Sequence, residues 1–331
     1  MKIAVFSAQP YDRRFLDAES SKHGAIELVY FTEALSLNAT VLAHGCQAVC
    51  VFVNDVLDAP VLDALARLGV RAVLLRCAGF NNLDIAAAAR LGLFVARVPA
   101  YSPEAVAEHT LALILTLNRN THRAHARIRE GNFALDGLLG SNLHGKTVGV
   151  VGLGKIGMAA VRIFKGFGCH VLGSDPAPPP EFAAMGELTP LAALLPRSDI
   201  VSLHCPLMAS TLHMIDAAAL SVMKPGAMLV NTSRGALIDT CAVIDALKSR
   251  QLGSLAIDVY EQESELFFHD HSAEIIGDDV FQRLLTFPNV LVTGHQGFFT
   301  VEAMREIAQT TLGNLACYVN GTPCANAVPG T

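Results

Sequence analysis

Several features are missing from this sequence, and each absence argues against a class of protein. Tryptophan is absent, and charged residues make up only 16% of the 331 residues, whereas 52% are hydrophobic. Disordered chains show the opposite balance, so a folded protein with large cores is expected. The net charge is −6, which argues against nucleic acid as a partner, because nucleic-acid-binding proteins need a basic surface for phosphates.

Long hydrophobic runs are missing as well. The most apolar stretch, Leu111–Leu117, is far shorter than the roughly 20 residues of a membrane-spanning helix. The first residues, Met1–Phe15, lack the charged and apolar regions of a signal peptide. We therefore expect no membrane segment and a cytoplasmic protein.

No CxxC pair occurs among the eight cysteines, which are scattered along the chain. Their apolar neighbours favour buried free thiols over disulfides or a metal site. Free thiols persist in a reducing compartment, which again indicates the cytoplasm. We expect no bound metal, and we expect His269 and His271 at the surface.

Two series of strands and helices are present, as expected for two domains in a chain of this length. In the first series, helical patterns such as Ala59–Leu68 and Asp84–Leu91 separate continuous apolar strands. This alternation predicts an open α/β unit with a parallel sheet that is covered on both faces. The strands are expected at Ile3–Phe6, Ile26–Phe31, Ala48–Val53, Ala72–Arg76 and Phe94–Val98.

One long helix is predicted from Ser102 to Glu130, between the two series. Its second half carries Arg119, Arg123 and Arg127 at helical spacing, which favours a solvated or subunit-facing stripe over a phosphate site. Six strands with helical crossovers follow, as a doubly wound dinucleotide domain requires. They are expected at Lys146–Val151, Cys169–Gly173, Asp199–Leu203, Ala227–Asn231, Ser254–Val259 and Val290–Thr293, with a last helix over Val301–Val319.

The first strand of the second series runs into a glycine-rich turn. Gly152, Gly154 and Gly157 follow this strand and precede a helical run, the context that gives a GxGxxG pattern its meaning. These glycines permit a tight turn, the approach of a pyrophosphate, and close packing of helix and strand. Asp175 ends the next strand about 20 residues later, where it can bind the adenosine ribose and repel a 2′-phosphate. The pattern predicts NAD as the cofactor in preference to NADP.

Three polar segments follow later strands of the same domain, at the edge where open α/β sheets bind ligands. Arg234 follows one strand, where it could form a structural ion pair or bind a substrate carboxylate and polarise the adjacent carbonyl. Glu263 follows the next strand, and His295 follows the last. A histidine beside a carboxylate from a neighbouring strand end is typical of an acid–base pair. The three residues together predict a reacting centre for a small 2-keto or 2-hydroxy acid.

Longer motifs extend this pattern over nearly the whole chain. They are Leu75–Asn82, Val98–His109, Gly152–Gly157, His204–Leu207, Asn231–Asp239, Asp258–Glu263 and Gly294–Gly297. In these motifs the sequence resembles the D-isomer-specific 2-hydroxyacid dehydrogenases, and most closely their D-lactate dehydrogenase branch. The resemblance implies an enzyme with two doubly wound parallel-sheet α/β domains. A flavodoxin-like substrate domain would comprise residues 1–100 plus 300–331, and a Rossmann NAD domain residues 101–299.

The resemblance also implies roles for single residues. Protonated His295 would donate to the carbonyl oxygen, Glu263 would orient and stabilise the imidazolium, and Arg234 would stabilise the oxyanion and anchor the carboxylate. The cofactor-binding residues would be Gly152, Gly154, Lys155, Ile156, Gly157, Asp175, Cys205, Pro206, Thr232, Ser233 and Asp258. The substrate-binding residues would be Phe52, Arg76, Ala78, Gly79, Tyr101 and Phe299.

The implied activity is reversible hydride transfer between NADH and pyruvate, giving D-lactate. Phe52, Tyr101 and Phe299 would enclose the substrate side chain and leave room for little more than a methyl group. A bulkier D-2-hydroxy acid is the alternative substrate, whereas phosphoglycerate is disfavoured because no basic cluster for its phosphate is evident. The alternative outside the enzymes is an NAD(H)-sensing corepressor, but such relatives carry extra interaction segments that we expect to be absent. The likeness also implies a homodimer or homotetramer.

Overall fold

The computed structural model describes residues 1–24 and 26–331, apart from the side chain of Glu265. The chain divides into two compact units. Unit 1 contains Met1–Ser102 together with Phe299–Thr331, and unit 2 contains Pro103–Phe298. Unit 1 is therefore built from two separate stretches of chain.

Unit 1 holds a five-stranded sheet in which all neighbouring strands are parallel. Its strand order is β2-β1-β3-β4-β5, the order of flavodoxin-like sheets. Every predicted strand of this unit is present, with small differences at its ends. The strands are β1 (Lys2–Val5), β2 (Glu27–Tyr30), β3 (Ala48–Val51), β4 (Ala72–Leu75) and β5 (Phe94–Arg97).

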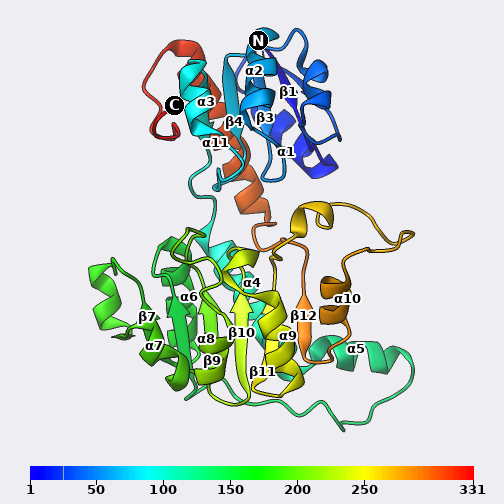
Figure 1. The fold of residues 1–331 in the computed structure, drawn as a ribbon, viewed down its shortest axis with the longest axis vertical. Helices are drawn as coiled ribbons and strands as arrows, with labels where there is room; N and C mark the ends of the chain where they lie inside the picture. The colour runs from blue at the N-terminus through cyan, green and yellow to red at the C-terminus, as the bar shows by residue number, and fades with distance from the viewer. Residues whose placement is uncertain (25) are drawn as a thin grey trace. The chain divides into compact units, whose positions relative to one another are not determined.

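Helices cover both faces of this sheet (Figure 1). α1 (Pro10–Ser20) and α11 (Val301–Asn320) pack together on one face, and α2 (Ala59–Arg67) and α3 (Ile85–Arg90) cover the other with the 3-10 helix η1 (Asn38–Ala43). Alternate residues of β1, β3, β4 and β5 belong to the two different cores. Burial on both faces is the reason why these strands are continuous apolar runs.

Unit 2 holds a seven-stranded parallel sheet with the order β12-β11-β10-β9-β6-β7-β8. Counted from β6, this is the doubly wound order of dinucleotide-binding domains, extended by one strand. The predicted fold class is therefore confirmed. The strands are β6 (Thr147–Val151), β7 (His170–Ser174), β8 (Glu187–Leu188), β9 (Ile200–Leu203), β10 (Ala227–Asn231), β11 (Leu252–Ile257) and β12 (Val290–Val292).

Two layers of helices cover the sheet of unit 2. α4 and α6 pack against each other on one face, and α7, α8, α9 and α10 cover the other. Because the strands are parallel, their carboxyl ends meet at one edge, where the loops carry most of the predicted site residues. The helices are α4 (Pro103–Arg119), α5 (Thr121–Arg129), α6 (Lys155–Gly166), α7 (Leu191–Leu194), α8 (Ala217–Val222), α9 (Thr240–Lys248) and α10 (Asp279–Leu285), with the 3-10 helices η2 (Pro180–Ala184), η3 (Leu195–Arg197), η4 (Gly235–Leu237) and η5 (Glu263–Glu265).

The prediction of one helix over Ser102–Glu130 was wrong. The segment forms two helices, α4 and α5, and they are separated at Asn120, whose φ of 52° lies in the left-handed region. An α-helix cannot continue through this backbone conformation. The arginines predicted as one stripe therefore belong to two helices. Strand β8 was also not predicted.

All eight cysteines are free thiols, as predicted. Burial was predicted for all of them, and this was wrong for three: Cys241 is exposed, and Cys317 and Cys324 are half-buried. None of the helices in the described part of the chain combines the length and the apolar composition that a bilayer span needs.

Candidate active site

The glycine-rich turn joins β6 to α6, and close backbone contacts explain two of its glycines. Gly152 has a φ of 93°, and a Cβ there would lie 2.6 Å from the backbone nitrogen of Cys205. A Cβ on Gly157 would lie 1.9 Å from the carbonyl oxygen of Gly152. Gly154 is the N-cap of α6, and a Cβ there would meet nothing within 4 Å. Open space before the first N–H groups of a helix suits a pyrophosphate, so the turn fits a dinucleotide.

Asp175 follows β7 and closes the turn from the neighbouring strand. Its Oδ2 accepts a hydrogen bond from the backbone nitrogen of Leu153 at 2.6 Å, and its Oδ1 accepts one from Ala177 at 2.8 Å. The carboxylate therefore stands at the strand end where an adenosine ribose is expected.

A cavity of about 700 Å³ lies beside this turn, with Gly154, Lys155 and Asp175 in its wall. Arg162 of α6 also lines it and lies 3.6 Å from Glu104 of α4. Sequence reasoning missed Arg162 because it lies well inside the helix, and only the fold brings it to the cavity. A concave space with glycine, lysine and carboxylate in its wall is suited to the adenosine half of a dinucleotide.

Arg234 follows β10 in a segment that the buried Asn231 holds in place. The Asn231 side chain donates to the carbonyl oxygen of Arg234 at 2.8 Å and accepts from the backbone nitrogen of Ser233 at 3.0 Å. A Cβ on Gly235 would lie 2.1 Å from the carbonyl carbon of Tyr260, so this segment passes directly over the loop that follows β11. Within the described residues, no carboxylate pairs with the half-buried guanidinium of Arg234. The structural ion pair considered from the sequence is therefore not formed with any described side chain.

His295 and Glu263 follow the neighbouring strands β12 and β11, and their side chains meet. Nδ1 of His295 lies 2.7 Å from Oε1 of Glu263, and both side chains are 16% exposed. Oε2 of Glu263 accepts a hydrogen bond from the backbone nitrogen of Tyr260 at 2.9 Å. The rings of Phe268 and Phe298 flank the imidazole, with centroids 5.8 and 6.4 Å away. Since Nδ1 faces the carboxylate, Nε2 is the ring nitrogen left to exchange a proton with a ligand.

The loop that carries His295 has an unusual backbone, which Asp258 stabilises. His295 has a φ of 53°, a conformation that few residues other than glycine adopt. The carbonyl oxygen of Asp258 accepts from the backbone nitrogen of His295 at 2.8 Å. Its carboxylate accepts from the backbone nitrogens of Gln296 and Gly297 at 2.9 and 2.7 Å. Asp258 therefore holds the backbone of three consecutive residues.

A second glutamate, Glu261, leaves β11 in the same loop but has different partners. It accepts hydrogen bonds from the backbone and the hydroxyl of Thr240, and it lies 2.6 Å from Nε2 of His213. Glu261 therefore supports the start of α9. Glu263 is the glutamate of this pair that reaches His295.

Known proteins are similar to this chain in sequence and in fold. The family model for the NAD-binding domain of D-isomer-specific 2-hydroxyacid dehydrogenases matches residues 111–297. The chain belongs to the D-isomer-specific 2-hydroxyacid dehydrogenases. It is an enzyme of this family, and NAD is its cofactor, as predicted.

Full-length relatives agree with the family assignment. The chain is 58% identical over 330 residues to 2-hydroxyacid dehydrogenase A of Aspergillus oryzae, a match that covers 99% of this chain and 95% of that protein. It is 57% identical over 331 residues to D-lactate dehydrogenase kk1H of Curvularia clavata, with the same coverage. The apo-structure of D-lactate dehydrogenase from Escherichia coli matches with a TM-score of 0.91 at 49% identity, covering 99% of this chain and 100% of that one.

The remaining cofactor residues predicted for this dehydrogenase lie at neighbouring strand ends of unit 2. The hydroxyl of Ser233 donates to the carbonyl oxygen of Cys205 at 2.7 Å, which joins the segments after β10 and β9. Burial raises the pKa of the Cys205 thiol to about 11, so it stays neutral. Lys155 and Ile156 form the first turn of α6, and Pro206 and Thr232 adjoin the two segments.

Unit 1 of the dehydrogenase contains the residues predicted for the substrate. Ala78 and Gly79 follow β4, and their backbone N–H groups make no hydrogen bond to other residues of the described chain. The Phe299 ring is 49% exposed and lies edge-on to Tyr11, with centroids 4.7 Å apart. Phe52 and Tyr101 are half-buried. The two backbone N–H groups are therefore without a hydrogen-bond partner among the described residues, and the three aromatic residues belong to the same unit.

Arg76 was predicted to bind substrate, and the structure does not support this. The residue is 1% exposed, and its guanidinium lies 3.3 Å from Asp12 and donates to the carbonyl oxygen of Ser7 at 2.8 Å. It also stacks under the ring of Phe52, 4.9 Å from its centroid. Arg76 is thus a buried support for the segment that carries Phe52.

Sequence reasoning missed three supporting residues of unit 2. Nε2 of His109 on α4 lies 3.1 Å from the hydroxyl of Thr293 and 3.2 Å from the carboxylate of Asp258. Burial favours a raised pKa for Asp258, but hydrogen bonds from His109 and Thr293 outweigh it and lower this pKa. The hydroxyl of Thr110 lies 2.8 Å from that of Thr232. His109 stands in a motif that the family likeness had included without a role.

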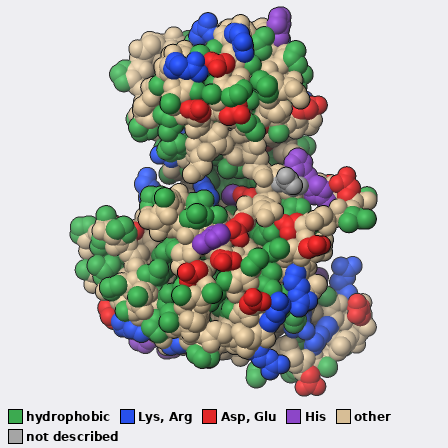
Figure 2. Space-filling model, in the orientation of Figure 1, with side chains coloured by type: hydrophobic (Ala, Val, Ile, Leu, Met, Phe, Trp, Pro, Cys, Tyr) green, Lys and Arg blue, Asp and Glu red, His purple; other side chains and the backbone are tan. Residues whose placement is uncertain are grey.

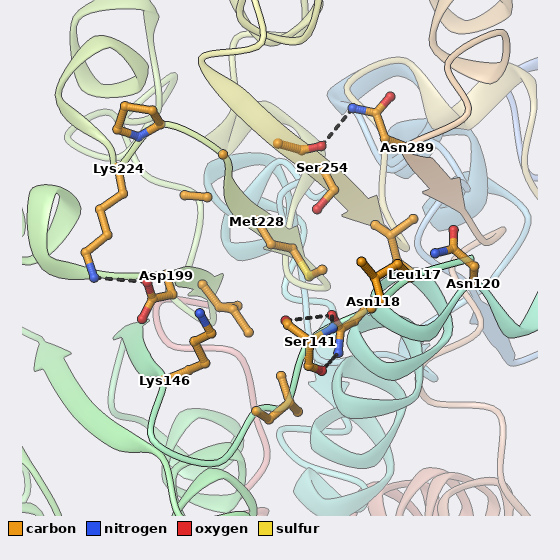
Figure 3. A pocket seen from close by; sticks show the side chains of 18 of the residues that line it. Leu117, Asn118, Asn120, Ser141, Lys146, Asp199, Lys224, Met228, Ser254 and Asn289 are labelled. Carbon is orange, nitrogen blue, oxygen red and sulfur yellow. Dashed lines mark hydrogen bonds and ion pairs between the residues drawn. The ribbon is translucent and has the colours of Figure 1, made fainter. Parts of the chain in front are cut away.

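A second cavity, of about 590 Å³, opens at the opposite edge of the same sheet (Figure 3). It is lined by residues at the amino ends of the strands, where Nζ of Lys224 lies 3.0 Å from Asp199 and Asn118 bonds to Ser141. The glycine-rich turn, Arg234, Glu263 and His295 are absent from its wall. This cavity is therefore separate from the dehydrogenase site.

Proposed function

We propose that this dehydrogenase is a D-lactate dehydrogenase, which reversibly reduces pyruvate to D-lactate with NADH. The observation that carries the proposal is the 2.7 Å contact between Glu263 and Nδ1 of His295. Glu263 follows β11, which lies between β12, followed by His295, and β10, followed by Arg234. This is the arrangement that a proton transfer to a carbonyl oxygen requires. The names of the relatives from Curvularia clavata and Escherichia coli support the choice of pyruvate.

Nε2 of His295 is the general acid in the reduction and the general base in the oxidation. Reduced nicotinamide supplies a hydride to the keto carbon when bound. Protonated His295 donates its Nε2 proton to the carbonyl oxygen, and neutral His295 accepts a proton from the hydroxyl in the reverse direction. The carboxylate of Glu263 keeps Nδ1 protonated and stabilises the imidazolium that the oxidation creates.

The guanidinium of Arg234 binds the substrate carboxylate and stabilises the charge that develops on the carbonyl oxygen. Nη1 donates to the carbonyl oxygen of Ser233 at 2.6 Å. No carboxylate of the described chain neutralises the guanidinium, so its charge and its remaining N–H groups serve the substrate. The backbone N–H groups of Ala78 and Gly79 receive the substrate carboxylate as well. Phe52, Tyr101 and Phe299 enclose the substrate methyl group.

The cofactor is held by the turn after β6 and by the neighbouring strand ends. Gly154, Lys155 and Ile156, at the first turn of α6, would hold the pyrophosphate of the cofactor. Asp175 binds the adenosine ribose. Cys205, Pro206, Thr232, Ser233 and Asp258 line the nicotinamide half.

Self-association is part of the proposal, as a homodimer or a homotetramer. The segment from α5 to residue 139 exposes four large apolar side chains: Ile128 (54%), Phe133 (72%), Leu135 (82%) and Leu139 (95%). Figure 2 shows Lys and Arg side chains gathered on the part of unit 2 that carries α5 and α10. Exposed apolar side chains of this size mark interaction surfaces. Sedimentation equilibrium of the wild type and of Leu135→Asp tests this, and a monomeric wild type would contradict it.

The deciding experiment is a panel of 2-keto acids assayed with NADH, followed by chiral chromatography of the lactate formed. We expect the highest kcat/KM for pyruvate and only the D product. A higher kcat/KM for 2-ketoisocaproate would show a dehydrogenase for bulkier acids, and L-lactate would overturn the proposed chemistry of the site.

A further inference from the structure

Two consecutive residues of α4 reach two different loops of the site. His109 faces the loop after β12, which carries His295, and Thr110 faces the segment after β10, which carries Arg234. α4 is a helix of 17 residues that packs against β10, β11 and β12. One helix therefore contacts three adjacent strands, and the loops after these strands carry Arg234, Glu263 and His295.

The contact of His109 with the His295 loop involves both polar atoms and close packing. Its Nε2 lies 3.1 Å from Oγ1 of Thr293 and 3.2 Å from Oδ1 of Asp258. The same Asp258 carboxylate binds the backbone nitrogens of Gln296 and Gly297. Through Asp258, His109 is thus linked to the backbone of the two residues that follow His295.

Gly297 shows how closely the loop rests on His109. A Cβ at this position would lie 3.4 Å from Cδ2 of His109 and 3.0 Å from Oδ2 of Asp258. A side chain at residue 297 would require these neighbours to shift by a few tenths of an ångström. The imidazole of His109 packs directly against this loop.

Thr110 makes the second connection. Its side chain is fully buried, and its hydroxyl bonds to the carbonyl oxygen of Val106 and to the hydroxyl of Thr232, both at 2.8 Å. Thr232 comes two residues before Arg234 in the segment that Asn231 holds. A buried hydroxyl pair of this kind sets the position of the segment, because loss of one partner leaves the other without a hydrogen bond.

We propose that His109 and Thr110 are positioning residues for hydride transfer, which keep His295 and Arg234 in register by tying both loops to α4. The proposal rests on the proposed roles of His295 and Arg234. Its physical basis is that a displacement of about 1 Å in a reacting group can cost a factor of about 100 in rate. The two residues act through Asp258, Thr293 and Thr232 and do not touch the substrate.

Variants of His109 test the first connection. His109→Leu keeps the bulk of the side chain and removes the hydrogen bond, so we expect kcat for pyruvate to fall by about 10- to 100-fold, with the Kd for NADH within threefold of wild type. His109→Gln keeps an N–H donor that can reach Asp258, and it should recover most of the lost kcat. A purely structural residue would lower Tm in both variants and leave kcat unchanged well below Tm.

Variants of Thr110 test the second connection and keep the proposal open to refutation if His109→Leu does not fold. Thr110→Val retains the shape and should raise KM for pyruvate by about threefold to tenfold, as expected for one lost buried hydrogen bond. Thr110→Ser keeps the hydroxyl and should have the wild-type KM for pyruvate. Thr311→Val in α11 is the matched control, because Thr311 is 1% exposed and its hydroxyl has no partner among the described residues.

A double variant separates this proposal from the proposed function. If His109 acts through His295, His109→Leu should lower kcat by less than about threefold in the His295→Gln background, since residues that work as a unit are not additive. Loss of activity in His295→Gln, with wild-type kcat and KM in His109→Leu and Thr110→Val, would overturn the positioning role alone. Full activity in His295→Gln would overturn the proposed function itself.

Discussion

Oε1 of Glu263 lies 2.7 Å from Nδ1 of His295, while the other oxygen of the same carboxylate is bound by the backbone of Tyr260. Each carboxylate oxygen of Glu263 therefore has its own partner, and Oε1 places negative charge next to the imidazole. Glu263→Gln keeps an oxygen that can accept from Nδ1 but loses the charge. We expect kcat for pyruvate reduction to fall by about 10-fold or more. Glu261→Gln is the matched control, and equal losses in both variants would count against the pairing.

His295→Gln should retain NADH binding and lose most catalysis, because an amide does not donate a proton as imidazolium does. General acid–base groups contribute a factor of about 100 to 10,000. Stopped-flow or steady-state kcat with pyruvate measures the loss, and the quench of NADH fluorescence reports binding. His213→Gln, whose histidine pairs with Glu261 at 2.6 Å, is the control. Turnover of His295→Gln within threefold of wild type would remove His295 from the mechanism.

Asp175→Ala should weaken the preference for NADH over NADPH by about tenfold, or about 1.4 kcal/mol. The substitution removes both the acceptor for the ribose and the repulsion of a 2′-phosphate. The ratio of kcat/KM for the two cofactors is the measurement. Glu181→Ala changes another acid that lines the same cavity, and it should leave the ratio within threefold. A wild-type enzyme that uses NADPH as well as NADH would refute this role of Asp175.

Phe52→Leu should improve 2-ketoisocaproate relative to pyruvate by about tenfold, since each methylene in such a pocket is worth about 1–3 kcal/mol. Phe299→Ala should act in the same direction. The ratio of kcat/KM for the two acids is the readout. Phe94→Leu, a phenylalanine of β5 that packs against Tyr318, is the control. An unchanged ratio in both pocket variants would mean that other residues enclose the substrate side chain.

Because His204 is buried with a lowered pKa, we expect the protein to lose stability in mild acid. Nε2 of His204 lies 2.8 Å from the hydroxyl of Ser202, and burial lowers its pKa to about 4. The folded-state pKa is thus below the ordinary value of about 6.5, so between these values the unfolded chain binds a proton that the folded protein does not. As the pH is lowered through this window, the free energy of unfolding should fall by up to about 1.4 kcal/mol for each pH unit.

The measurement for His204 is Tm at pH 7.5 and at pH 5. His204→Gln should lose less Tm between the two values than the wild type does. The lowered pKa of Asp258 acts in the same direction but only at lower pH, because a carboxylate with a depressed pKa loses its contribution below about pH 4. An identical fall of Tm in the variant and the wild type would show that His204 is not the group responsible.

Most of the fold could be predicted from the sequence because parallel strands buried on both faces are continuous apolar runs. The parts that could not be predicted have weak local signals. β8 has two residues, Glu187 and Leu188, both exposed. The break at Asn120 depends on one residue in the left-handed conformation, and asparagine occurs in intact helices as well.

The positions of the candidate site residues were predictable where a side chain follows a strand, as Arg234, Glu263 and His295 do. It was not predictable where the partner comes from a distant helix. His109 lies in an apolar helical pattern, 184 residues from Thr293 in the chain. Arg76 stands in a family motif, and the burial that makes it structural depends on Asp12, 64 residues away. Such contacts exist only once the sheet order is established.

The return of α11 to unit 1 has a consequence for synthesis of the chain. Residues Ile3, Val5 and Leu74 share a core with Leu312 and Leu315 of α11, and during translation they emerge from the ribosome long before that helix does. Unit 2 is complete once Phe298 has emerged. On one face of the earlier unit α1 is already present, but the part that α11 covers stays exposed until this last helix appears. The second unit in the sequence is therefore the first whose whole chain is available to fold, and a nascent chain arrested before residue 301 would expose this apolar face to chaperones.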